Sequence, residues 1–227
     1  MRLRKKRVAF VVMTLCLIVA FVCGRLYDLK AQSKRKNVLS VYKNALEQPY
    51  MNWDELESYE NLTSSHTTLY EFGLIDLNGD GCYELIIKNP MTSFVSGQYR
   101  LYTVIDGELK ELQRAQAIEI NDQTHIISCT DAYMGHYWGE YSRLDDKGQL
   151  EALATYEAVD TYTNPERDII YAGRINGVSV RYTTCRIGEQ EVAYEEFVDQ
   201  VNEMVDNGVF YKVPLVSNTE DNRLRLL

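Results

Sequence analysis

The sequence predicts an α+β protein with an apolar N-terminal helix, short helices, a mostly antiparallel β-sheet domain and a C-terminal helix. Three observations predict this class. After residue 68 the apolar residues alternate with a period of two, in short runs separated by turn residues. The stretches before and after that region have the period of three to four residues that is typical of helices. The chain begins with a basic run and an uncharged apolar segment.

The N-terminal segment has the features of a membrane anchor. Residues 1–7 hold five basic side chains and no acid, and residues 8–24 contain no charged or amide side chain. A membrane span needs roughly 17–25 apolar residues, and basic flanks stay in the cytoplasm. We therefore expect an uncleaved single-pass anchor in the cell membrane, with residues 1–7 cytoplasmic and the rest extracellular. Cleavage after Gly24, which would secrete the protein, and lipidation of Cys23 are the alternatives.

The remainder divides into three parts. Residues 25–37 are polar, basic and aperiodic, which predicts a juxtamembrane linker. Residues 38–214 should form the extracellular α+β domain, which begins with a helix over 38–46 and a second short helix over 52–62. Residues 215–227 are mostly polar and are expected to form a loose C-terminal tail.

The centre of the domain is expected to be a chain of short strands. Glycine, asparagine and aspartate punctuate it, for example at Asp106-Gly107 and Asn176-Gly177, and these residues tolerate the positive φ of tight hairpins. Sequential strands joined in this way predict antiparallel pairing. A helix over 191–207, ended by Gly208, should follow. The expected strands are 69–75, 82–88, 98–105, 109–115, 117–120, 125–129, 137–144, 150–158, 169–172 and 178–187.

Charge limits the partners. The formal net charge is −9, although the basic residues are concentrated near the N-terminus, so the domain is more acidic than the total indicates. Nucleic-acid binding depends on neutralising phosphates with basic side chains, and no nucleic-acid partner is expected. An acidic domain suits divalent cations or a solvated extracellular surface.

One motif carries recognisable chemistry, Asp76-x-Asn78-x-Asp80-Gly81-x-x-Glu84. Calcium takes six to eight oxygen ligands, and side chains at alternate positions of a curled loop converge on one point. Three carboxylates within nine residues repel one another without a cation. We therefore expect a structural Ca²⁺ at residues 76–84; the alternative is a plain turn. The expected ligands are Asp76, Asn78, Asp80, the backbone carbonyl of Cys82, and Glu84.

The loop is not a full EF-hand, because its twelfth position is Ile87 and its flanks are strand-like. It resembles the shorter strand–loop–strand calcium motif of integrin-type FG-GAP propeller blades. The stretch Phe72–Lys88, FGLIDLNGDGCYELIIK, also resembles a family of uncharacterised secreted or membrane-anchored proteins and lipoproteins of Gram-positive gut bacteria. A strand ending in Asp106-Gly107 and a late helix near 194–204 are similar too. Asn78 and Cys82 depart from the usual residues without removing a ligand oxygen. The resemblance implies an extracellular location and no particular activity.

No catalytic residue is predicted. The chain lacks a Gly-x-Ser-x-Gly elbow, a His-Glu-x-x-His motif and a P-loop. Its histidines, His66, His125 and His136, are scattered along the sequence. Five cysteines with no Cys-x-x-Cys motif predict buried thiols; if a disulfide forms, Cys129–Cys185 is the pair to test.

The segment Tyr133–Tyr141 is dense in aromatic residues. It could be a platform for a sugar or a peptide. We favour a strand in which Tyr137, Gly139 and Tyr141 alternate with Trp138 and Glu140.

The function expected from the sequence is a non-enzymatic, calcium-stabilised binding module at the cell surface, with a surface protein or a glycan as its ligand. The alternative is an enzyme that acts on cell-wall or dietary glycans. An acidic cleft lined by the aromatic side chains of residues 133–141 would favour the enzyme, and a filled core with only the calcium loop exposed would favour the module.

Overall fold

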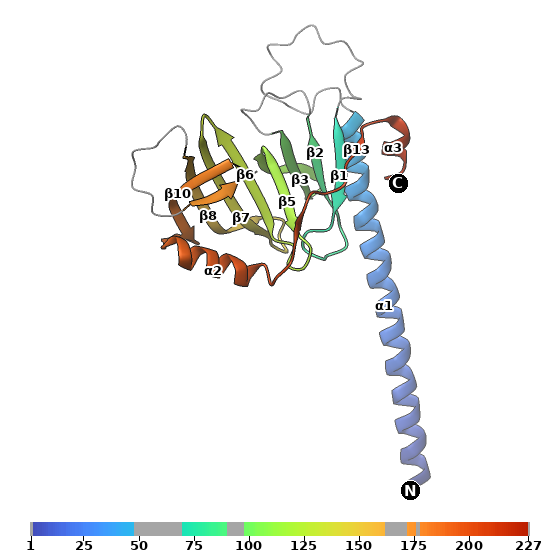
Figure 1. Ribbon diagram of the computed structural model, residues 1–227. Coiled ribbons are helices and arrows are strands. Elements are labelled where there is room, and N and C mark those ends of the chain that lie inside the picture. Colours follow the sequence, from blue (N-terminus) through green and yellow to red (C-terminus); the bar gives the residue numbers. More distant parts are fainter. Residues whose placement is uncertain (1, 48–69, 90–97, 162–171, 176–177, 227) are drawn as a thin grey trace.

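The computed structural model describes residues 2–47, 70–89, 98–161, 172–175 and 178–226 (Figure 1), with side chains from Val19 onward except at residues 20, 26, 27 and 172–174. The predicted class is confirmed: the protein is α+β, with two mostly antiparallel sheets. The helix expected over 52–62 lies outside the described residues. The strands are β1 Glu71–Ile75, β2 Glu84–Lys88, β3 Tyr99–Ile105, β4 Glu108–Ala115, β5 Ala117–Asn121, β6 Ile127–Tyr133, β7 His136–Leu144, β8 Leu150–Asp160, β9 Ala172–Ile175, β10 Val178–Ile187, β11 Gln190–Glu191, β12 Phe210–Tyr211 and β13 Val216–Ser217; the helices are α1 Arg2–Glu47, α2 Tyr194–Met204 and α3 Glu220–Leu224.

Helix α1 is continuous over 46 residues and projects far beyond the sheets (Figure 1). The expected linker, residues 25–37, is therefore helical. Val38, Tyr42 and Leu46 recur every four residues on one side of the helix and are buried in the core. The Tyr42 hydroxyl donates a hydrogen bond to the Tyr83 carbonyl at 2.8 Å. The last three turns of α1 thus belong to the folded domain.

Among the residues whose side chains are described, no helix is long and apolar enough to cross a membrane. Most of the expected anchor, residues 8–18 and Ala20, lies outside that set.

The smaller sheet has the order β13-β1-β2-β3-β4. Alternation along its strands produces two apolar faces. Phe72, Leu85, Ile87 and Tyr102 pack with the buried side of α1. Ile86 and Leu101 pack on the other face with residues of the second sheet, including Ile118, Ile120 and Ile127. The smaller sheet is therefore the middle layer between α1 and part of the larger sheet.

The larger sheet has the order β11-β10-β8-β7-β6-β5-β12, and β9 pairs with β10. Helix α2 covers one of its faces, where Phe197 and Val201 pack with Tyr141 and Tyr156. Gln116 joins the two sheets at the point where β4 ends and β5 begins. Its amide donates to the Asp131 carboxylate at 2.8 Å, and its side chain donates to the Ala132 carbonyl at 2.6 Å.

The predicted antiparallel meander is confirmed for the consecutive strands β1 to β4 and β5 to β8. Several boundaries are wrong: β2 begins at Glu84 and not at residue 82, β9 extends to Ile175 beyond the expected end at 172, and the helix expected over 191–207 spans Tyr194–Met204. Strand β6 begins at Ile127, not at residue 125, because the preceding turn occupies these positions: His125 has a φ of 56° and its amide donates to the Asn121 carbonyl at 3.0 Å.

The C-terminal tail is ordered, contrary to the expectation of a loose segment. Strand β13 pairs with β1, and the short helix α3 is capped by Thr219, whose hydroxyl accepts a hydrogen bond from the Asn222 amide at 3.2 Å. The buried side chain of Asn218 donates to the Leu46 carbonyl at 2.9 Å, at the end of α1. The tail therefore fastens the two ends of the folded domain together.

Candidate functional site

The predicted calcium loop connects β1 to β2. Gly79 and Gly81 have φ values of 73° and 79°. Residues with a side chain rarely adopt this backbone conformation, and it allows the loop to curl. Asn78 and Asp80 each accept a hydrogen bond from the amide two residues ahead, at 3.1 and 2.7 Å. Such Asx turns hold both side chains on the inner side of the curl.

The other two carboxylates are also held by backbone amides. Asp76 accepts from the Gly79 amide at 2.8 Å and from the Gly81 amide at 2.9 Å. Glu84 begins β2, is 3% exposed, and accepts from the Leu77 amide at 2.9 Å and from the Thr103 hydroxyl at 3.3 Å. Each of the four oxygen-bearing side chains thus accepts a hydrogen bond from a backbone amide of the loop.

The five expected ligands lie in one loop, but their oxygen atoms do not converge on a common point as the ligands of a bound metal would. In the described part of the chain, no three His, Cys, Asp or Glu side chains converge closely enough to hold a metal ion. The carboxylate oxygens point to amide and hydroxyl donors, and Asp80 also points to a cation of the protein itself. The ligand assignment stays a prediction.

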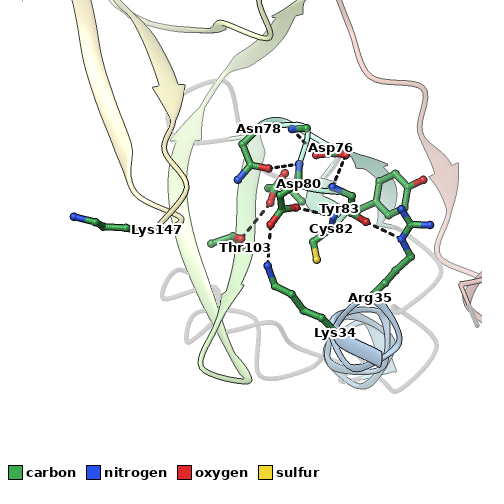
Figure 2. Close-up of polar contacts among 12 residues, drawn as sticks. Lys34, Arg35, Asp76, Asn78, Asp80, Cys82, Tyr83, Thr103 and Lys147 are labelled. Carbon is green, nitrogen blue, oxygen red and sulfur yellow. Dashed lines mark hydrogen bonds and ion pairs between the residues drawn. The ribbon is translucent and has the colours of Figure 1, made fainter. Parts of the chain in front are cut away.

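That cation is Lys34 of α1 (Figure 2). Its ammonium group lies 2.8 Å from Oδ2 of Asp80. The neighbouring Arg35 donates from Nε to the Gly81 carbonyl at 2.7 Å, and its guanidinium lies 5.3 Å from the centre of the Tyr83 ring. Sequence reasoning does not find this contact, because the partners are 46 residues apart and the pattern of residues 25–37 is that of a linker. The only signal in the sequence was a basic run in a chain whose one motif is acidic.

The pKa values of Glu84 and Asp80 are shifted in opposite directions. Burial raises the pKa of Glu84 to about 7, with a smaller contribution from the negative charges of Asp80 and Asp76. Burial also opposes ionisation of Asp80, but hydrogen bonds from Lys34 and the Cys82 amide outweigh it, so the pKa of Asp80 lies below its usual value. The bond to Asp80 raises the pKa of Lys34. Glu84 is therefore a buried carboxyl group that ionises at a higher pH than an exposed glutamate.

A small cavity of about 180 Å³ opens beside the loop. Its lining includes Lys34, Asp80, Glu84, Thr103 of β3 and Lys147 of the β7–β8 turn. It has room for an ion with a few waters and is smaller than the roughly 300–1,000 Å³ of typical ligand pockets.

The aromatic segment 133–141 forms the β6–β7 hairpin, with its turn at Met134 and Gly135. The predicted alternation is confirmed. Tyr137 and Tyr141 pack in the core beneath α2, whereas Trp138 and Glu140 line a groove of about 330 Å³ on the opposite face. The sequence located the hairpin but not the groove, whose other walls come from β4, β6, β8 and β10.

The remaining candidates are not brought together. His125 and His136 lie at opposite ends of β6, and His66 lies outside the described residues. Cys129 and Cys185 are buried free thiols. They lie on strands separated by β7 and β8, and only Cys185 faces α2. Neighbouring strands are about 4.8 Å apart, so the two cannot reach the Cα separation of under roughly 7 Å that a disulfide needs.

Searches against protein-family models, curated proteins and solved structures find no match for this chain. The function is therefore argued from the geometry of the loop and the groove.

Proposed function

We propose that the protein is an extracellular, non-enzymatic binding module that is stabilised by calcium and anchored in the cell membrane by residues 8–24. The observation that carries the calcium assignment is the curled loop with its buried Glu84. Its side-chain oxygens are preorganised by backbone amides, and a negative charge is enclosed behind them.

The donor chemistry favours calcium. The side chains of Asp76, Asn78, Asp80 and Glu84 offer hard oxygen donors, which suit calcium or magnesium better than zinc. A carboxylate oxygen that accepts one hydrogen bond still has a lone pair for a metal. The ammonium of Lys34 on Asp80 supports the view that the loop attracts a cation.

The location is part of the proposal. Residues 1–7 would lie in the cytoplasm and the domain outside, because the basic run precedes the uncharged segment. Cleavage of the segment would give the same module in secreted form.

The calcium proposal is tested by thermal unfolding of the full chain in detergent, with calcium, with magnesium and with chelator. A ligand that binds only the folded form stabilises it by about 2.7 kcal/mol at a hundredfold excess over its dissociation constant. We expect calcium to raise the melting temperature. Asp80→Asn should reduce that response, because asparagine keeps the Asx turn but removes the charge.

The matched control is Asp206→Asn, the same exchange in the turn after α2. It should keep the full calcium response. If the wild-type protein melts at one temperature in all three buffers, the loop is only a turn and the calcium assignment is wrong.

One observation favours the alternative function, an enzyme that hydrolyses glycans. The groove combines an exposed tryptophan with Asp131, Glu140 and Glu157, which meets the criterion of an acidic cleft lined by the aromatic hairpin. Hydrolysis of a glycosidic bond commonly uses two carboxylates that flank it. The test is release of reducing sugar from cell-wall and plant polysaccharides. Suppose that the wild type releases sugar and that Glu157→Gln and Glu140→Gln abolish this activity without changing the melting temperature. The protein would then be an enzyme and not a binding module.

A further inference from the structure

The groove is built from two cross-strand rows on the face of the larger sheet opposite to α2. In the first row Asp131 of β6 pairs with Trp138 of β7, which pairs with Glu157 of β8. In the second row Glu140 lies between Cys129 and Thr155. Directly opposed residues have Cβ atoms about 4.5–5.5 Å apart. The indole of Trp138 therefore has a carboxylate on each side and a third two residues further along its own strand.

These side chains are accessible. Trp138 is 44% exposed, although a large aromatic ring is usually buried, and Glu157 is exposed as well. Within the described ranges, neither Glu140 nor Glu157 forms a hydrogen bond or an ion pair with another side chain. Asp131 is different: one of its oxygens holds the Gln116 amide. The indole face and two glutamates are thus open to a ligand, and Asp131 keeps its second carboxylate oxygen for one.

Two arginines, Arg114 and Arg186, also line the groove. Arg114 of β4 is bound to Glu111, and Arg186 of β10 lies 3.7 Å from Glu191. Each is thus paired with an acid outside the groove. The three carboxylates around the indole therefore outnumber the two arginines of the groove.

The domain as a whole has the same sign. Ten of the 24 basic residues but only one of the 33 acidic residues lie in the first 37 positions, so residues 38–227 carry 14 basic and 32 acidic side chains, a formal charge of −18. A field of this sign attracts cations and raises their association rate. It repels anionic partners.

We propose that the groove binds a lysine or arginine side chain of a basic protein segment, with the cation over the indole of Trp138 and between Asp131 and Glu157. An aromatic face attracts a cation within about 6 Å of its centroid, and a carboxylate adds a charge-assisted hydrogen bond. The volume of about 330 Å³ fits one long side chain and its neighbours. This inference deepens the proposed binding function by naming the ligand, and it does not depend on the calcium loop.

A glycan would use the same indole by stacking but would gain nothing from three carboxylates beyond hydrogen bonds. A neutral sugar also would not respond to the charge of the domain. The acidic surroundings therefore favour the cationic segment, and the two ligands differ in the salt dependence of their binding.

The experiment is calorimetric titration of the full chain in detergent with a synthetic peptide of alternating arginine and serine. A peptide with citrulline in place of arginine and a chitin oligosaccharide are titrated in parallel. We expect the arginine peptide to bind, its affinity to fall steeply with added salt, and the citrulline peptide to bind at least tenfold more weakly.

Variants locate the site. Trp138→Ala should weaken binding of the arginine peptide about tenfold. Glu157→Gln, which keeps the shape of the side chain, should weaken binding severalfold and reduce its salt dependence. The control Glu203→Gln makes the same exchange on exposed α2, which covers the other face of the sheet, and should change nothing.

Three results would overturn the proposal: no binding of the arginine peptide, equal binding of the citrulline peptide, or loss of binding in Glu203→Gln as large as in Glu157→Gln. Binding of the oligosaccharide alone, without salt dependence, would assign the groove to glycans. Each result is independent of the calcium melts, so failure here leaves the calcium assignment standing, and failure of that assignment leaves this one.

Discussion

At the scale of single residues, Glu84 is the most deeply buried carboxyl group of the candidate site. Its carboxylate is 3% exposed and its pKa is about 7, because burial disfavours the ionised form. In the unfolded chain the pKa returns to its ordinary value of about 4.5. The folded state therefore binds the proton more tightly than the unfolded state. The contribution of Glu84 to stability is fully present below about pH 4.5 and is lost as the pH rises to about 7.

This predicts a pH dependence in the absence of metal. The free energy of unfolding of the wild type in chelator should fall by roughly 3 kcal/mol between pH 4.5 and pH 8 through this group alone. Glu84→Gln should lack that part of the slope. Denaturant titrations of both proteins at several pH values measure the difference. Parallel curves would mean that Glu84 is not buried as an acid. The proposed calcium would bind the ionised form of Glu84, so stabilisation by calcium should grow over the same pH range.

A second residue-scale prediction concerns Lys34. Its ammonium is hydrogen-bonded to the Asp80 oxygen that points out of the loop. If calcium uses that oxygen, Lys34 must leave, so Lys34→Gln should raise the calcium affinity severalfold. Lys36→Gln, a change in an exposed side chain two residues away, is the control. Calcium titrations followed by calorimetry give both affinities; an unchanged affinity in Lys34→Gln would show that lysine and metal do not compete.

At the scale of elements, the packing of β7 against β8 depends on the absence of a side chain at Gly139. A Cβ atom there would overlap the ring of Tyr156, which packs beneath α2. Gly139→Ala should therefore destabilise the domain by about 1–3 kcal/mol, the usual cost of overpacking. Tyr156→Leu in the same chain should recover part of that loss. Thermal unfolding of the two single variants and the double variant measures the coupling, and additive losses would show that the ring is not the obstacle.

The tail offers a second element-scale prediction. A chain ended after residue 214 loses the β13 pairing to β1 and the Asn218 side chain that binds the Leu46 carbonyl. It should melt several degrees lower, because a buried carbonyl and a strand edge lose their partners. Asn218→Ala in the full chain should show a part of this effect. A truncated chain that melts like the wild type would mean that the tail is an appendage.

The elements differ in how far the sequence predicts them. The strands between residues 98 and 160 were predicted within a few residues, because alternation and glycine turns are local signals. The tail was not, since Asn218 and Thr219 are polar side chains whose partners are backbone groups and whose pattern is that of a solvated loop. The candidate loop was visible as a motif, but the docking of Lys34 and the far walls of the groove depend on contacts across many residues.

At the scale of the whole molecule, the protein consists of a folded domain and one long helix that is part of its core. The candidate loop connects β1 to β2 of the smaller sheet. Most of the groove lies on strands of the larger sheet. Variants at one site therefore leave the residues of the other unchanged. The larger sheet has the acidic groove on one face, and α2 packs on the other (Figure 1).

The continuity of α1 has a mechanical consequence. Thirteen residues, 25–37, separate the proposed anchor from Val38, where the helix enters the core. If residues 8–24 are the anchor, these residues, at about 1.5 Å and 100° per residue, would hold Val38 about 20 Å from the bilayer and would also fix the rotational orientation of the domain around the helix axis. Removing one residue would lower the domain by little more than an ångström but swing the groove through more than a quarter of a circle. Removing seven residues, about two turns, would restore the orientation of the domain at roughly half the distance from the bilayer. A partner fixed in the same membrane would be sensitive to the first change far more than to the second.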